Sequence, residues 1–212
     1  MLGLNCVSEL IFTPRCIGCG IRSSGLCSDC QESWVFRQLV SHICGVTIFS
    51  EVAYSAVAGK ILLAAKENGL READEFMFAA LDCSLQRFLT KNLSQPLLVP
   101  IPSQRSSNRR RGRNFVTDLA QRLGDRHNLQ ISEILIHSRK VADQSLLNSI
   151  ERNANLSHAL VVSERFGGGR EVLLVDDLVT SGSTLKEAIR ALKSSGFCVV
   201  GAITACVALP LR

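Results

Sequence analysis

The sequence predicts an α/β protein in which a mostly parallel sheet is covered by helices on both faces, with a small cysteine-rich module in front of it. From about residue 46 onward, apolar segments of strand character alternate with amphipathic segments of helical character, an order typical of parallel sheets. Residues 172–175 are apolar throughout, as a strand buried on both faces requires. Four cysteines lie together between residues 16 and 30. We therefore expect a module over residues 1–45 and an α/β domain over residues 46–212.

Composition bounds the kind of protein. The chain has 212 residues, of which 46% are hydrophobic and 20% charged, values typical of a globular protein with one medium-sized domain. Aromatic residues make up only 5%, which argues against a base-stacking platform for single-stranded nucleic acid. No apolar run is long enough to cross a membrane. The first twelve residues carry no basic residue, so they do not resemble a signal peptide, and we expect the protein in the cytoplasm.

Thiols stay reduced in the cytoplasm, so the nine cysteines need an explanation other than disulfides. Two C-x2-C turns separated by seven residues are typical of one tetrahedral zinc site with four thiolate ligands, Cys16, Cys19, Cys27 and Cys30. Redox chemistry at a single C-x-x-C is the alternative. The other cysteines are expected to be small buried residues; they are Cys6, Cys44, Cys83, Cys198 and Cys206.

The pattern of apolar residues places the expected elements along the chain. A first helix is expected to end before Pro14. Helices are further expected at residues 31–40, 58–69, 72–89, 115–123 and 184–195, with Gly124 closing the fourth of these. Strands are expected at residues 46–57, 97–101, 131–136, 171–175 and 198–209.

The segment from residue 172 to residue 195 has the form of a phosphate-binding turn. Two acids, Asp176 and Asp177, follow the apolar strand, and a loop rich in hydroxyl groups then leads into a helix. Such a helix start offers backbone N–H groups and a partial positive charge, and ligands of open α/β sheets bind beyond the carboxyl ends of strands. The loop residues that would hold the phosphate are Thr180, Ser181, Gly182, Ser183 and Thr184.

The same residues also have a purely structural interpretation. Ser183 or Thr184 could cap the helix, and Glu187 is spaced for a capping box with Thr184. In the functional interpretation, the acids beside a phosphate cradle are suited to the vicinal hydroxyls of a ribose 5-phosphate, and the residues alone leave both interpretations open. No G-x-x-x-x-G-K-[ST] motif is present, which excludes a P-loop.

Basic residues are also concentrated locally, within a net charge of +5. Five arginines lie within nine residues, which indicates a polyanionic ligand, either a phosphorylated small molecule or nucleic acid. The alternative is a solvated surface loop. The five are Arg105, Arg109, Arg110, Arg111 and Arg113.

The stretch VLLVDDLVTSGST resembles the 5-phosphoribosyl 1-pyrophosphate (PRPP) signature of type I phosphoribosyltransferases. Three other parts of the chain resemble the ComF competence-protein family. They are residues 99–102 with the arginines after them, residues 139–155, and the paired cysteines ahead of the domain. One departure concerns residues 112–115, Gly-Arg-Asn-Phe, where that family usually reads Gly-Phe-Asn-Gln.

The resemblance implies a type I phosphoribosyltransferase fold with a zinc-binding module in front. Asp176 and Asp177 would then be catalytic and hold the ribose. A second loop would face the pyrophosphate through Pro100, Ile101, Pro102, Ser103, Arg105, Arg109, Arg110 and Arg111. A mobile loop would close over the site with Arg139, Lys140, Gln144 and Arg152. Magnesium would be bound mainly through substrate oxygens.

Three functions are compatible with this resemblance. The first is transfer of a phosphoribosyl group from PRPP to an acceptor that the sequence does not identify. The second is a non-catalytic accessory of DNA uptake and natural transformation that binds single-stranded DNA through the basic cluster and the zinc module. The third is a scaffold that docks a helicase-like partner through the zinc module.

Overall fold

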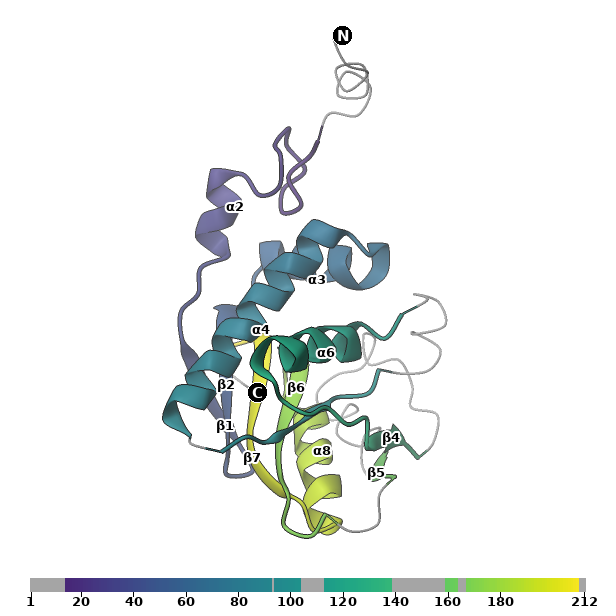
Figure 1. Ribbon diagram of the computed structural model, residues 1–212. Helices are drawn as coiled ribbons and strands as arrows, with labels where there is room; N and C mark the ends of the chain where they lie inside the picture. The colour runs from purple at the N-terminus through teal and green to yellow at the C-terminus, as the bar shows by residue number, and fades with distance from the viewer. Residues whose placement is uncertain (1–13, 93, 104–112, 139–158, 164–166, 210–212) are drawn as a thin grey trace.

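A five-stranded sheet forms the middle layer of the main body (Figure 1). The computed structural model describes residues 14–92, 94–103, 113–138, 159–163 and 167–209. The strand order is β1-β2-β7-β6-β3, and all neighbours are parallel except β1 and β2. The predicted mostly parallel sheet is therefore confirmed. The strands are β1 (Leu39–Ile43), β2 (Val46–Ala53), β3 (Leu97–Pro100), β6 (Glu171–Val179) and β7 (Cys198–Val207).

Helices cover both faces of this sheet, as the sequence predicts (Figure 1). One face packs against α3 (Ala56–Asn68), α4 (Arg71–Lys91) and α6 (Phe115–His127). The other face packs against α8 (Ser183–Ser194). Each face buries its own apolar cluster, and the strands supply alternate residues to the two clusters.

Helix α6 continues past the glycine that was expected to end it. Gly124 is buried inside the helix, and a Cβ atom there would lie 2.8 Å from the carbonyl oxygen of Leu129. The glycine thus permits close packing of the following chain. Asn128 instead ends the helix in the left-handed conformation with φ of 53°, which asparagine adopts more readily than most residues.

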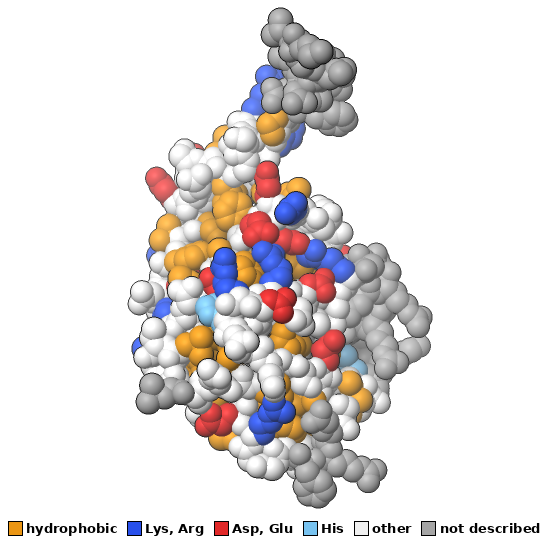
Figure 2. All heavy atoms as spheres, in the orientation of Figure 1, with side chains coloured by type: hydrophobic (Ala, Val, Ile, Leu, Met, Phe, Trp, Pro, Cys, Tyr) orange, Lys and Arg blue, Asp and Glu red, His pale blue; other side chains and the backbone are white. Residues whose placement is uncertain are grey.

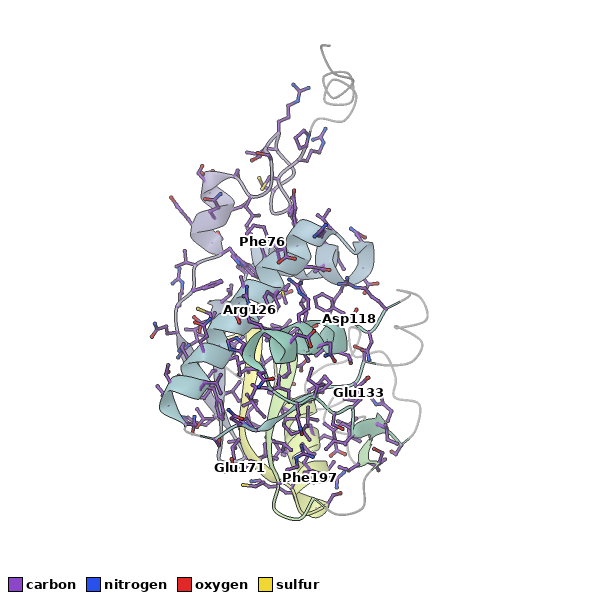
Figure 3. All side chains as sticks on the ribbon, viewed as in Figure 1. Phe76, Asp118, Arg126, Glu133, Glu171 and Phe197 are labelled. Carbon is purple, nitrogen blue, oxygen red and sulfur yellow. The ribbon has the colours of Figure 1, made fainter. Side chains whose placement is uncertain are left out.

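The N-terminal module packs onto the α3 and α4 side of the molecule (Figure 3). Its helix α2 spans Ser28–Ser33, so the helix expected at residues 31–40 is wrong. The chain leaves the helix at Trp34, whose buried ring meets the ring of Phe76 in α4 edge-on, with centroids 6.1 Å apart. After Trp34 the chain continues into β1, whose backbone forms hydrogen bonds with β2.

The β1–β2 hairpin spans the expected domain boundary at residues 45 and 46. Ile43 pairs with Val46 across its turn. The last residues of the expected module therefore form the edge strand of the sheet.

The strand expected at residues 131–136 also differs from the structure. Only Leu135–His137 forms a strand, β4, and it pairs with β5 (Leu160–Val162) in a separate two-stranded sheet. Ile131 makes a single bridge to Leu98 of β3. Among the described residues, no helix is long and apolar enough to cross a membrane.

Candidate functional site

Strand β6 carries the two acids into the protein interior. It runs on to Val179, four residues further than expected, so Asp176 and Asp177 belong to the strand and not to the rim of a loop. They are only 9% and 3% exposed. Asp176 lines a surface pocket together with the hydroxyl-rich loop. Asp177 lies beside Lys66 of α3.

The loop after β6, which the sequence predicts to hold a phosphate, lines that pocket. Gly182 adopts the left-handed conformation with φ of 73°, which favours glycine, and it is the N-cap residue of α8. The Ser181 and Ser183 hydroxyl oxygens are 2.8 Å apart and hydrogen-bonded. The pocket is lined by Asp176, Leu178, Val179, Thr180, Ser181, Gly182, Ser183, Thr184 and Leu185. It therefore combines hydroxyl groups, a helix N-terminus and one acid.

The capping expected at this helix is wrong in its details. Because Gly182 is the N-cap residue, neither Ser183 nor Thr184 occupies that position. The Glu187 carboxylate accepts hydrogen bonds from the backbone N–H of Leu160 at 3.2 Å and from Arg190 Nε at 2.8 Å. Glu187 thus ties α8 to the β4–β5 hairpin.

The acidic pair has unusual electrostatics. Burial and the adjacent charge of Asp177 raise the pKa of Asp176 to about 8. Lys66 opposes this rise by a smaller amount. The backbone N–H of Asp177 donates a hydrogen bond of 2.9 Å to Asp176 Oδ1. At neutral pH Asp176 is therefore mostly protonated.

Sequence reasoning did not single out Lys66, whose ammonium group forms an ion pair with Asp177 Oδ2. Lys66 lies in the last turn of a helix, where an exposed lysine is common because it complements the helix dipole. No local signal distinguishes it from such a lysine. Only the packing of α3 beside the end of β6 brings the two residues together.

The loop expected to face pyrophosphate starts at the same edge of the sheet. Pro100 is the last residue of β3 and pairs with Val175, and the N–H of Ile101 donates to the Val175 carbonyl at 2.8 Å. Pro102 and Ser103 follow and are partly exposed. Arg105, Arg109, Arg110 and Arg111 lie outside the described residues.

The β4–β5 hairpin holds the two ends of the segment expected to be a mobile loop. The N–H of Ser138 donates to the Ala159 carbonyl at 2.9 Å. His137 Nε2 donates to the carbonyl of Pro102 at 3.0 Å, which fixes the hairpin to the loop after β3. Arg139, Lys140, Gln144 and Arg152 lie outside the described residues.

One arginine of the basic cluster serves the fold. Arg113 makes a two-point ion pair with Asp74, with distances of 2.6 and 2.8 Å, and also donates to the Ala65 carbonyl. It joins the start of α6 to α3 and α4. Arg113 therefore has Asp74 and the Ala65 carbonyl as its partners in the fold. This residue stands at the position where the chain departs from the ComF pattern.

The four cysteines of the N-terminal module converge as predicted. Their sulfur atoms all lie within 4.8 Å of one another. The Cys27 Sγ atom is 3.7 Å from Cys16 Sγ and 3.6 Å from Cys19 Sγ. A tetrahedral zinc ion with Zn–S bonds of about 2.3 Å would place its sulfur ligands about 3.8 Å apart. This cluster could therefore bind zinc.

Backbone groups already favour negative charge at this cluster. Burial would raise the pKa of Cys16, but hydrogen bonds from the backbone N–H groups of Cys27, Cys19 and Gly18 lower it to about 6. The N–H of Cys27 lies 3.3 Å from Cys16 Sγ. Burial and the neighbouring thiols raise the pKa of Cys30 to about 12; a bound cation would favour its thiolate.

The remaining cysteines only partly match their expected burial. Cys206 is buried and Cys83 is half-buried, but Cys44 and Cys198 are exposed. Cys44 occupies the turn of the β1–β2 hairpin, and Cys198 is the first residue of β7. Cys6 lies outside the described residues.

Comparisons with known proteins agree with this geometry. A family described as the phosphoribosyl transferase domain matches residues 72–209, which is more than half of the chain. This chain belongs to the phosphoribosyl transferase domain family. It has the type I phosphoribosyltransferase fold, preceded by a four-cysteine cluster. The matched residues include the acidic pair and the loop into α8, but not Lys66 or the cysteines.

The chain is also similar to "Competence protein F" of Haemophilus influenzae. The two sequences are 27% identical over 216 aligned positions, which cover 87% of this chain and 93% of that protein. The resemblance to the ComF competence-protein family is thereby confirmed.

The raised pKa of Asp176 predicts a specific dependence of stability on pH. Between about pH 4 and pH 8 the unfolded chain has this carboxyl ionised, whereas the folded chain keeps it protonated. The folded state then binds more protons, so the contribution of Asp176 to stability falls as pH rises through this window. We expect Asp176→Asn to gain stability relative to the wild type over this window, by at most about 1.4 kcal/mol per pH unit.

Denaturant unfolding at several pH values measures this difference. Asparagine keeps an oxygen that can accept the N–H of Asp177, so the comparison isolates the charge. Asp125→Asn, at an exposed position of α6, is the matched control and should show no such rise. A flat difference for Asp176→Asn would mean that the carboxyl is ionised in the folded protein.

Proposed function

We propose that this protein binds PRPP or a related ribose 5-phosphate ligand at the end of β6. The observation that carries the proposal is a pocket lined by a glycine turn, four hydroxyl side chains, the start of α8 and Asp176. Backbone N–H groups and hydroxyls are suited to the 5-phosphate, because the helix start favours an anion. Asp176, which lines the pocket, would bind a ribose hydroxyl, with Asp177 next to it.

The neighbouring loops suit the rest of the ligand. Pro102 and Ser103 follow β3, which is adjacent to β6, so they are proposed to face the pyrophosphate. Arg105, Arg109, Arg110 and Arg111 follow in sequence and are proposed to neutralise its charge. Magnesium bound mainly through the ligand's oxygens would screen that charge further. The segment carrying Arg139, Lys140, Gln144 and Arg152 is proposed to close over the ligand.

Transfer of the phosphoribosyl group would follow from such binding. The bond between the anomeric carbon and the pyrophosphate oxygen would break, and an acceptor nucleophile would bond to that carbon. Positive charge that builds on the ribose would be stabilised electrostatically by the acidic pair.

Binding of PRPP with magnesium is measured by isothermal titration calorimetry. We expect the wild type to bind and the double variant Asp176→Asn/Asp177→Asn to bind at least about tenfold more weakly. The double variant removes all negative charge from the pair, and a hydrogen bond to a charged group contributes about 1.5–3 kcal/mol. Glu171→Gln is the matched control, because Glu171 is exposed at the opposite end of the same strand (Figure 3). Equal affinities for the wild type and the double variant would refute the site.

A structural zinc ion is proposed for Cys16, Cys19, Cys27 and Cys30. We expect protein purified under reducing conditions to contain about one zinc per chain by elemental analysis. Cys16→Ser should lose most of this zinc and unfold at a lower temperature, because the module has little core of its own and structural zinc contributes folding energy. Cys44→Ser, at an exposed position outside the cluster, is the control. A wild type free of zinc would contradict the proposal.

Binding of single-stranded DNA is a second candidate, favoured by the similarity to a protein named for competence. The described part of the α4–α6 face does not offer a uniformly positive surface, because basic and acidic side chains are intermixed there (Figure 2). Arg122 pairs with Glu75 at 2.8 Å and Arg126 with Asp82 at 3.0 Å. A DNA site would therefore depend on the arginines at residues 105–111 or on the zinc module.

Salt dependence separates the two candidates. If several phosphates of an oligonucleotide are bound, affinity should fall steeply between about 50 and 200 mM salt. Replacing Arg109, Arg110 and Arg111 by glutamine should then reduce the slope. If the oligonucleotide does not bind at 50 mM salt while PRPP does, the DNA candidate is wrong.

A further inference from the structure

Lys66 provides a positive charge at the buried acidic pair. It extends from the last turn of α3, and its ammonium group meets Asp177 Oδ2. The Lys66 side chain is 23% exposed and that of Asp177 only 5%. The two side chains form an ion pair, so opposite charges attract each other at this buried position.

The position of Lys66 makes the two acids unequal. Two adjacent buried carboxyl groups repel when both are ionised, and each loses the solvation of water. A cation beside one of them compensates the charge on that side. Asp177, on the Lys66 side, is thereby favoured as the ionised member, and Asp176 is left facing the pocket.

We propose that Lys66 is a positioning residue for the ligand site: it holds Asp177 as the ionised member of the pair and leaves Asp176 available to the ligand's sugar hydroxyls. This inference rests on the proposed binding of PRPP. It adds to the site a residue that lies outside the matched family region at residues 72–209.

If Lys66 has this role, removing its charge should change the pH at which the acidic pair titrates. Among the described residues, the titratable groups that act on Asp176 are Asp177 of the same strand, which raises its pKa, and Lys66 of α3, which lowers it. Cys206 of β7 also lies close enough to be affected by Asp177 and Lys66. Its pKa is raised to about 12, chiefly by burial, so it stays neutral. Loss of the lysine charge must therefore move the titration of the pair to higher pH.

The test measures PRPP affinity, with magnesium, from pH 6 to pH 9 for the wild type and Lys66→Met. We expect Lys66→Met to bind at least about tenfold more weakly at neutral pH, because Asp177 then loses the cation that favours its ionised form. One pKa unit of lost interaction corresponds to that factor. The midpoint of its pH dependence should also lie higher than that of the wild type. Lys66→Arg should keep most of the affinity. Lys60→Met, at an exposed lysine of the same helix, should bind like the wild type.

A second variant and the affinity of the wild type separate failure to fold from failure to bind. If Lys66→Met fails to fold, the double variant Lys66→Met/Asp177→Asn removes the isolated buried charge and should fold. Its pH midpoint should fall below that of the wild type, because Asp177 no longer raises the pKa of Asp176. A wild type that does not bind PRPP would refute the proposed function itself. A wild type that binds, with Lys66→Met equal to it in affinity and pH midpoint, would refute only the role of Lys66.

Discussion

Two adjacent carboxyl groups, those of Asp176 and Asp177, are buried near the carboxyl end of β6, and the arrangement of this end of the molecule depends on them. Ionised carboxyl groups are costly to bury, so such a pair must bind a proton, meet a cation, or both. Here Asp176 retains a proton and Asp177 meets Lys66. The pocket next to them combines hydroxyl groups with the start of α8. An acid that changes charge near neutral pH thus lies beside a site suited to an anion.

Parallel pairing explains why the separate parts of the site meet. The strands β2, β7, β6 and β3 run in the same direction, so their carboxyl ends lie along one edge. The loop after β3 and the loop after β6 therefore become neighbours although they are far apart in sequence. His137 adds a third segment, because it donates a hydrogen bond to the Pro102 carbonyl. The described parts of three expected ligand loops converge for this reason.

Helix α3 joins the cysteine cluster to this edge of the sheet. Near its start, Val57 packs so closely to the cluster that a Cβ atom on Gly18 would lie 3.1 Å from it. Near its end, Lys66 contacts Asp177. The buried Trp34 and the cysteines Cys16 and Cys30 belong to the same apolar cluster as α3 and α4. The module is thus part of the folded body, which explains why an expected boundary between residues 45 and 46 falls within a hairpin.

The sequence by itself determined the α/β class, the hydroxyl-rich turn from β6 into α8 and the convergence of the four cysteines. These features are local: an apolar run, a glycine among hydroxyl residues, and two short cysteine spacings each constrain the chain within a few residues. The tertiary structure alone decided that β6 continues through the acids, that Arg113 pairs with Asp74, and that Lys66 meets Asp177. The two ion pairs join residues that are far apart in the sequence. Arg113 and Asp74 are separated by 39 positions, and Lys66 and Asp177 by 111 positions. Side-chain charge alone does not reveal a partner, because packing selects which charges are brought together and removed from water.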